Sequence, residues 1–335
     1  MYSRTHNNSS RIILLLAGCL LSGGTAAVET PFSMSACLAE AMEEASDTTT
    51  IGELKRSCRH KQQAIQSEQE NGHTYTAIDR RYLKELSIRD NRFAITAHKP
   101  NYILIAAYDT SGINTTGLGT NVGKDTETKF QVSMKFPLIE GLLGDNGGDI
   151  YAAYTNRSFW QVYDQAASSP FRETNHEPEL WFSWNNQWNF LGFRNRAVRF
   201  GFNHQSNGQG AGLSRSWNRL FAEFIFENGR YAGALKTWWR IPEDDSKDDN
   251  PDIDEYMGYF ELLNVFTHKK HSLNIMLRNN LRSDMHGAVQ VDWNFPFIRH
   301  FDGYIQWFNG YGESLIDYNH NVNSIGIGVS LTDWL

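Results

Sequence analysis

Apolar and polar residues alternate with a period of two over most of the chain beyond residue 93. Between positions 130 and 138 the apolar side chains occupy the even positions, whereas Gln131, Ser133 and Lys135 occupy odd ones. The same pattern recurs over residues 273–277, 289–295 and 325–331. This period indicates β-strands with one apolar face, which a soluble sandwich would share. Charged and amide residues on the other face suit a polar lumen, so the pattern favours a membrane barrel.

We expect about twelve strands, which start near residues 101, 128, 149, 179, 196, 217, 231, 255, 271, 286, 302 and 323. Short connections follow the sixth, eighth and tenth strands, and long polar connections follow the first, third, seventh and eleventh. An even strand number with this asymmetry is typical of outer-membrane barrels whose two ends are periplasmic. The fold is therefore predicted to be all-β, a transmembrane antiparallel barrel over residues 91–335. Tryptophans such as Trp238 and Trp239 are expected in aromatic girdles at the membrane interfaces.

The N-terminus has the pattern of an export signal. Arg4 and Arg11 precede an apolar run over residues 12–21, and small residues follow up to Ala27. The run is short for a retained membrane anchor. Cys19 ends a segment similar to a lipoprotein cleavage box, but the apolar run continues past it. We therefore predict a signal peptide over residues 1–27, and the sequence leaves open whether Cys19 is lipidated.

Residues 28–90 are predicted to form an N-terminal periplasmic segment and linker. Residues 34–72 are rich in Ala, Glu, Lys and Gln, which indicates one or two short helices outside the membrane, and a polar linker is expected up to about Asp90. Cys37 and Cys58 would lie in an oxidising compartment, either as a disulfide or as two free thiols. This segment could also be an interaction module. The net charge of −7 gives no reason to expect nucleic acid as a partner.

A histidine, a serine and an asparagine fall on the apolar side of two neighbouring strands. His204 and Ser206 share a face with Phe200 and Phe202, and antiparallel pairing would return Asn218 beside His204. Polar groups facing lipid are costly unless they satisfy one another. Ser206 as nucleophile, His204 as general base and Asn218 as the group that orients the base would form a hydrolytic triad.

A lone His-x-Ser pattern on a strand is a weak signal by itself. The chain has no Gly-x-Ser-x-Gly elbow and no His-Glu-x-x-His motif, so these other hydrolase signatures are absent from the sequence. The alternative is a non-catalytic outer-membrane barrel, either a pore or a structural protein. The position of the triad favours the enzyme, because a pore would carry its functional polar groups in the lumen.

Long motifs resemble the outer-membrane phospholipase A family. The resemblance is carried by His204–Gly208 with Ser214–Arg219, and by Lys99–Tyr102, Ser168–Asn175, Asp249–Asp252, Tyr256–Tyr259 and Gly310–Tyr318. It implies a calcium-dependent phospholipase that hydrolyses acyl esters of glycerophospholipids and lysophospholipids in the bacterial outer membrane. It also implies an oxyanion hole made by the backbone N–H groups of Ser206 and Gly208.

The same resemblance implies a calcium ion and a homodimer. The calcium ligands would be the Ser214 side chain, the carbonyl of Gln209 and, from the second subunit, the carbonyl of Ser168. Asn156 matches a polar position of the dimer interface, where the family carries Gln. The catalytic loop departs from the family pattern at Gln205, which replaces an acidic residue, and at Gln209, which replaces Arg.

Overall fold

The chain forms two compact units, residues 1–70 and 71–335, and each is described here by itself. The computed structural model describes residues 34–45, 49–55, 57–59, 76–89, 95–116, 123–143, 147–210 and 212–335. The predicted signal peptide, residues 1–27, and Cys19 therefore lie outside the described residues. So do most residues of the predicted linker before residue 76.

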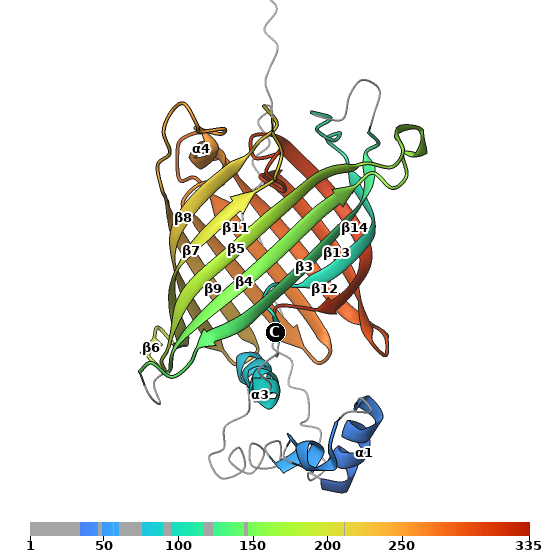
Figure 1. The fold of residues 1–335 in the computed structure, drawn as a ribbon, viewed down its shortest axis with the longest axis vertical. Coiled ribbons are helices and arrows are strands. Elements are labelled where there is room, and N and C mark those ends of the chain that lie inside the picture. The colour runs from blue at the N-terminus through green and yellow to red at the C-terminus, as the bar shows by residue number, and fades with distance from the viewer. Residues whose placement is uncertain are drawn as a thin grey trace, which may run out of the picture. The chain divides into compact units, whose positions relative to one another are not determined.

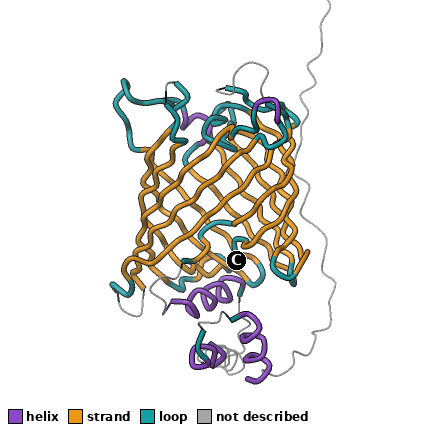
Figure 2. The backbone as a smooth tube through the Cα atoms, turned by 45° about the vertical axis from the view of Figure 1, so that its right-hand side comes forward, coloured by secondary structure: helices purple, strands orange, loops and turns teal. Residues whose placement is uncertain are grey.

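In the second unit, twelve long antiparallel strands of the described chain form a closed barrel, as the sequence predicts (Figures 1 and 2). Each strand pairs with the next along the chain, and β14 pairs with β2 to close the ring. The short strands β1 (Thr96–Ala97) and β6 (Asn189–Phe190) pair with β3 and β7. The long strands are β2 (Asn101–Asp109), β3 (Thr126–Ile139), β4 (Gly147–Trp160), β5 (Phe171–Asn185), β7 (Phe193–Ser206), β8 (Ser216–Asn228), β9 (Tyr231–Arg240), β10 (Phe260–His268), β11 (His271–Asn279), β12 (Gly287–Ile298), β13 (Phe301–Tyr311) and β14 (Asn321–Thr332).

The connections alternate in length, and we call the two ends of the barrel the long-loop end and the short-turn end (Figure 2). Residues 229–230, 269–270 and 299–300 make short turns, whereas 110–125 and 241–259 make long loops. Two strands start more than three residues away from their expected positions. β5 begins at Phe171 rather than near 179, and β10 begins at Phe260 rather than near 255. The helix α4 (Ile253–Met257) occupies the residues before β10, and its first turn is acidic, as suits a helix N-terminus.

The period of two separates the outside of the barrel from its lumen. Outward positions carry exposed apolar side chains such as Ile105, Phe200 and Ile327, which are 57%, 52% and 57% exposed. Inward positions on neighbouring strands carry buried polar residues such as Lys129 and Glu179. Apolar side chains of this size remain exposed in a ring only where lipid covers them.

Part of the lumen is an aromatic cluster, which the sequence did not predict. Trp181, Trp217 and Trp238 are buried and belong to one apolar cluster inside the barrel. Trp238 is therefore not a girdle residue, because its parity on β9 places it in the lumen, whereas Trp239 is exposed. The indole N–H of Trp217 donates to Gln205 Oε1 at 2.9 Å, and that of Trp238 donates to the carbonyl of Gly258 at 3.0 Å. Such a partner stabilises a buried indole.

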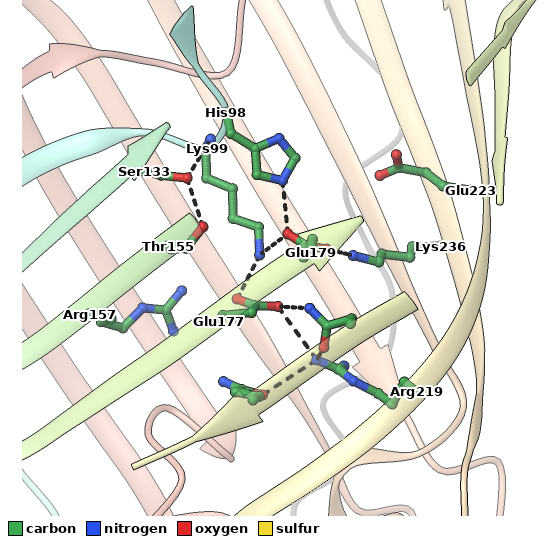
Figure 3. A network of polar contacts seen from close by, with 12 residues as sticks. His98, Lys99, Ser133, Thr155, Arg157, Glu177, Glu179, Arg219, Glu223 and Lys236 are labelled. Atoms are coloured by element: carbon green, nitrogen blue, oxygen red, sulfur yellow. Dashed lines mark hydrogen bonds and ion pairs between the residues drawn. The ribbon is translucent and has the colours of Figure 1, made fainter. Parts of the chain in front are cut away.

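Paired charges fill the lumen beside this cluster (Figure 3). Lys99 Nζ lies 2.7 Å from Glu177, and Lys236 Nζ lies 2.6 Å from Glu179. Nε2 of His98 lies 2.9 Å from Glu179, whose side chain is only 1% exposed. Buried charges are tolerated where they are paired in this way. Lys236 on β9 and the segment of His98 and Lys99 before β2 are all distant in sequence from β5, so these contacts brace the barrel wall from inside.

A helix lies at the short-turn end, in a segment expected to be a linker (Figure 1). The helix α3 (Ala77–Arg89) begins with a reciprocal cap, in which Thr76 Oγ1 accepts from the Asp79 N–H and Asp79 Oδ2 accepts from the Thr76 N–H. Arg81 donates to the carbonyls of Ala97, His98 and Trp334, which ties the helix to the barrel. The sequence reasoning missed this helix because six of its 13 residues are charged, which favoured a polar linker.

The first unit contains helices, as predicted. α1 (Met34–Glu44) is followed by helical residues 51–55 and 57–59. Cys37 and Cys58 form a disulfide with their Cα atoms 5.9 Å apart, so the alternative of two free thiols is excluded. Within the described ranges, the helices are too short or too polar to cross a membrane.

Candidate active site

The three residues of the predicted triad come together on the outside of the barrel. β7 ends at Ser206, β8 begins at Ser216, and residues 207–215 connect them at the long-loop end. The strand register pairs His204 with Asn218 and Ser206 with Ser216. These residues have the same parity as the exposed Phe200 and Phe202, so they face outward as the sequence predicts.

His204 and Asn218 form a direct hydrogen bond. Nδ1 of His204 lies 2.9 Å from Oδ1 of Asn218, and Nδ2 of Asn218 donates to Glu243 Oε1 at 3.2 Å. Because the carboxylate of Glu243 can only accept, it fixes the orientation of the asparagine amide. Oδ1 therefore faces the imidazole, Nδ1 carries the proton, and Nε2 is left free to accept one.

Ser206 lies two residues from His204 on the same face of β7. Within the described part of the chain, no hydrogen bond joins its hydroxyl to His204. Such contacts are often long in enzymes without substrate and tighten when substrate binds.

Asn207 holds the connection between β7 and β8. Its Oδ1 accepts from the N–H groups of Gln209 and Arg215, and its Nδ2 donates to the carbonyl of Leu213. Gly208 has a φ of +63°, a left-handed conformation that favours glycine. The N–H of Gly208 has no acceptor within the described residues, so this donor is available to a ligand.

The three candidate calcium ligands lie in two loops of the long-loop end. Gln209 and Ser214 belong to the β7–β8 connection, and Ser168 follows the short helix η2 (Gln165–Ala167) between β4 and β5. No described residue hydrogen-bonds to the carbonyl of Gln209 or to the hydroxyl of Ser214, whereas the carbonyls of Gly212 and Ser214 accept from Arg215. Among the described residues, no group of three His, Cys, Asp or Glu side chains could hold a metal.

Asn156 faces outward from β4 and contacts a histidine that the sequence analysis did not single out. Its Nδ2 lies 3.4 Å from Nδ1 of His176, and its Oδ1 accepts from Ser158 Oγ at 3.1 Å. The strand register places His176 between Asn156 and Ser206. Asn156, His176, Ser206 and Ser216 thus form an outward-facing polar row across β4, β5, β7 and β8.

Two residues near the triad escaped the sequence analysis. Glu243 lies in the long β9–β10 connection, whose acidic residues gave no signal of a specific partner. His176 was outside the expected fourth strand, and the correct start of β5 would have revealed its outward parity. Asn250 is buried and accepts from the Ser216 N–H at 2.9 Å, so the β9–β10 connection also supports the start of β8.

Comparisons with known proteins agree with this geometry. The family model described as phospholipase A1 matches residues 78–331. The chain belongs to the phospholipase A1 family. It is 40% identical to the phospholipase A1 of Salmonella typhimurium over 253 residues, which cover 74% of this chain and 85% of the relative. The putative phospholipase A1 of Neisseria meningitidis is 35% identical over 277 residues, which cover 79% of this chain and 72% of the relative.

Solved structures of this phospholipase family share the barrel. The outer-membrane phospholipase A of Escherichia coli matches with a TM-score of 0.68 and 36% identity, covering 73% of this chain and 95% of the other. The outer-membrane phospholipase of Salmonella typhi, solved as a dimer with bound calcium, matches with a TM-score of 0.69 and 37% identity, covering 74% and 96%. The chain is therefore an enzyme of the bacterial outer membrane, a phospholipase.

Proposed function

We propose that the chain hydrolyses the acyl esters of glycerophospholipids and lysophospholipids with Ser206, His204 and Asn218, in a calcium-dependent reaction. The observation that carries the proposal is the hydrogen bond from His204 Nδ1 to Asn218 Oδ1, on the face of the barrel that carries the exposed apolar residues. A site in this position meets lipid directly, so a phospholipid needs no transfer through water to reach it.

In the proposed reaction, Ser206 Oγ attacks the acyl carbonyl carbon while Nε2 of His204 takes its proton. The carbonyl oxygen becomes an oxyanion, which accepts from the N–H groups of Ser206 and Gly208. The C–O bond to the lysophospholipid then breaks, and His204 gives its proton to the leaving oxygen. Water, deprotonated by His204, attacks the acyl-serine and releases the fatty acid and free Ser206.

The residues fit a calcium ion by the chemistry of their donors. The carbonyl of Gln209 and the hydroxyl of Ser214 are neutral oxygens without a hydrogen-bond donor among the described residues, and Ca²⁺ prefers oxygen ligands. Ser168 of a second subunit would supply a further carbonyl. When bound, the ion would supply positive charge close to the developing oxyanion. Asn207, by holding this loop, positions both ligands relative to Ser206.

The proposed active form is a homodimer that meets through the polar row. Asn156 faces outward among exposed apolar side chains such as Val132 and Leu180, where exposure of a polar row to lipid is unfavourable. A second barrel against this face would cover the row and bring Ser168 to the site. The relative from Salmonella typhi was solved as a calcium-bound dimer, which supports this arrangement.

Release of fatty acid from phospholipid in detergent tests the proposal. Ser206→Ala should remove activity, and chelation of divalent cations should remove the activity of the unaltered enzyme, with recovery on addition of calcium. Ser272→Ala, a buried serine that faces the lumen, is the matched control and should retain activity. Activity that persists in Ser206→Ala would exclude the nucleophile, and activity indifferent to the chelator would exclude the calcium requirement. Cross-linking should detect more dimer with calcium than without.

A further inference from the structure

His176 lies next to the proposed nucleophile and has no role in the reaction described above. The register pairs it with Ser206, across neighbouring strands on the same outward face. Directly opposed side chains have Cβ atoms about 5 Å apart. The far side of the imidazole faces the loop, because Nε2 and Cδ2 lie 3.8 Å from the position that a Cβ would take on Gly208.

The hydrogen bonds at the other nitrogen determine the tautomer of His176. Nδ1 lies 3.4 Å from Asn156 Nδ2, and this amide nitrogen can only donate. In this orientation of the amide, the Ser158 hydroxyl donates to Asn156 Oδ1. Tyr154 Oη also lies 2.6 Å from Nδ1 and can donate to it. Nδ1 therefore accepts, and the proton of the neutral imidazole is on Nε2.

Nε2 of His176 thus lies close to Gly208, whose N–H has no acceptor among the described residues. The Cβ position and the amide nitrogen of one residue are about 2.5 Å apart, so the two donors are separated by at most about 6 Å. One oxygen can accept from both donors when they lie within about 5.8 Å of each other, twice the length of a hydrogen bond of about 2.9 Å. His204 precedes Ser206 on β7 itself, whereas His176 lies opposite Ser206 on the neighbouring strand β5.

We infer that His176 is a further catalytic residue, whose Nε2–H donates to the carbonyl oxygen of the substrate as that oxygen becomes negative. The inference rests on the proposed function of Ser206. His176 takes no proton in this role, and the atoms of the reaction balance as before. It adds a side-chain donor to the two backbone donors of the oxyanion hole, and Tyr154 and Asn156 keep that donor in the required tautomer. Preorganised donors of this kind act on the transition state more than on the bound ester.

Steady-state kinetics on three variants test the role of His176. His176→Phe keeps a ring without a donor and should lower kcat about 10-fold or more with little change in KM, as expected for a lost oxyanion donor. His176→Gln retains an N–H and should recover part of that loss. His271→Phe, the same substitution at the β10–β11 turn, should leave kcat unchanged. A long-chain trifluoromethyl ketone, which forms an oxyanion on serine, should bind His176→Phe more weakly by a similar factor.

Three results would overturn this inference. The first is a kcat of His176→Phe within about 2-fold of the unaltered enzyme. The second is an equal loss of kcat in His176→Phe and His176→Gln. The third is an affinity of His176→Phe for the trifluoromethyl ketone equal to that of the unaltered enzyme. If the His176 variants lose activity in proportion to their loss of cross-linked dimer, His176 belongs to the dimer interface and the inference is refuted. An active Ser206→Ala would refute the proposed function itself. An inactive Ser206→Ala together with a fully active His176→Phe would refute only the role of His176.

Discussion

Glu243 should control the activity of a triad that it does not belong to. Its carboxylate accepts from Asn218 Nδ2 at 3.2 Å, and this contact decides which end of the amide faces His204. Without Glu243, the asparagine can turn so that Nδ2 faces Nδ1 of His204. The imidazole would then carry its proton on Nε2, where it cannot act as a base toward Ser206. We therefore expect Glu243→Ala to lower kcat without unfolding the barrel.

The structure sets the size of this effect. A hydrogen bond to a charged group contributes about 1.5–3 kcal/mol when it is buried. Glu243 and Asn218 are only partly buried, so we expect about 1 kcal/mol of preference for the productive orientation. Since about 1.4 kcal/mol corresponds to a tenfold change in rate, Glu243→Ala should lower kcat about 5-fold. Glu243→Gln keeps an acceptor and should stay within about 2-fold of the unaltered enzyme.

Fatty-acid release from one phospholipid in detergent, at saturating calcium, is the assay for these variants. Glu255→Ala is the matched control, because Glu255 lies in the same β9–β10 connection and pairs with Arg282 rather than with the triad. In the Asn218→Ala background, Glu243→Ala should cause no further loss, because its only route to His204 has been removed. Additive losses in the double variant, or full activity of Glu243→Ala, would refute the reasoning.

Two further substitutions test the loop and the helix. Gly208→Ala places a side chain at a φ of +63°, which costs about 1–2 kcal/mol and displaces the N–H group. We expect kcat to fall at least about 10-fold. An unchanged kcat would show that Gly208 is not part of the oxyanion hole. Arg81→Ala removes donors to the carbonyls of Ala97, His98 and Trp334, each contributing about 0.5–1.5 kcal/mol. Protease should then cut within α3 of Arg81→Ala faster than within α3 of Arg80→Ala, while fatty-acid release is retained. Equal cleavage rates in the two variants would contradict a docked helix.

Strand parity made the barrel and the outward face of the triad predictable from sequence. The side-chain period of a strand is two, so the charged residues Arg199 and Glu223 fix the lumen side and place His204 and Asn218 on the opposite side. The pairing of His204 with Asn218 also followed, because both residues must face outward and this parity restricts the register of two adjacent antiparallel strands.

The missed features depend on information that a local pattern does not carry. Residues 171–178 include Pro178 and several charged or amide side chains, so the start of β5 was placed too late and His176 was lost from the strand. The lumenal position of Trp238 depends on partners distant in sequence, Trp217 and the carbonyl of Gly258. Glu243 reaches Asn218 across a long loop, and loop geometry of this length is not encoded in a periodic pattern.

The ion pairs in the lumen have a consequence for any attempt to alter this protein. Glu177 and Glu179 on β5 are held by Lys99 and Lys236, and Arg219 on β8 contacts Asn203 on β7 (Figure 3). The strands that carry the proposed catalytic residues on their outer side are therefore held in place by contacts on their inner side. A soluble enzyme usually places its site in a cleft supported by an apolar core, whereas this barrel supports an external site with an interior of paired charges. Hollowing the interior to make a channel would loosen the catalytic strands, so such a redesign should lose hydrolysis before it gains conductance.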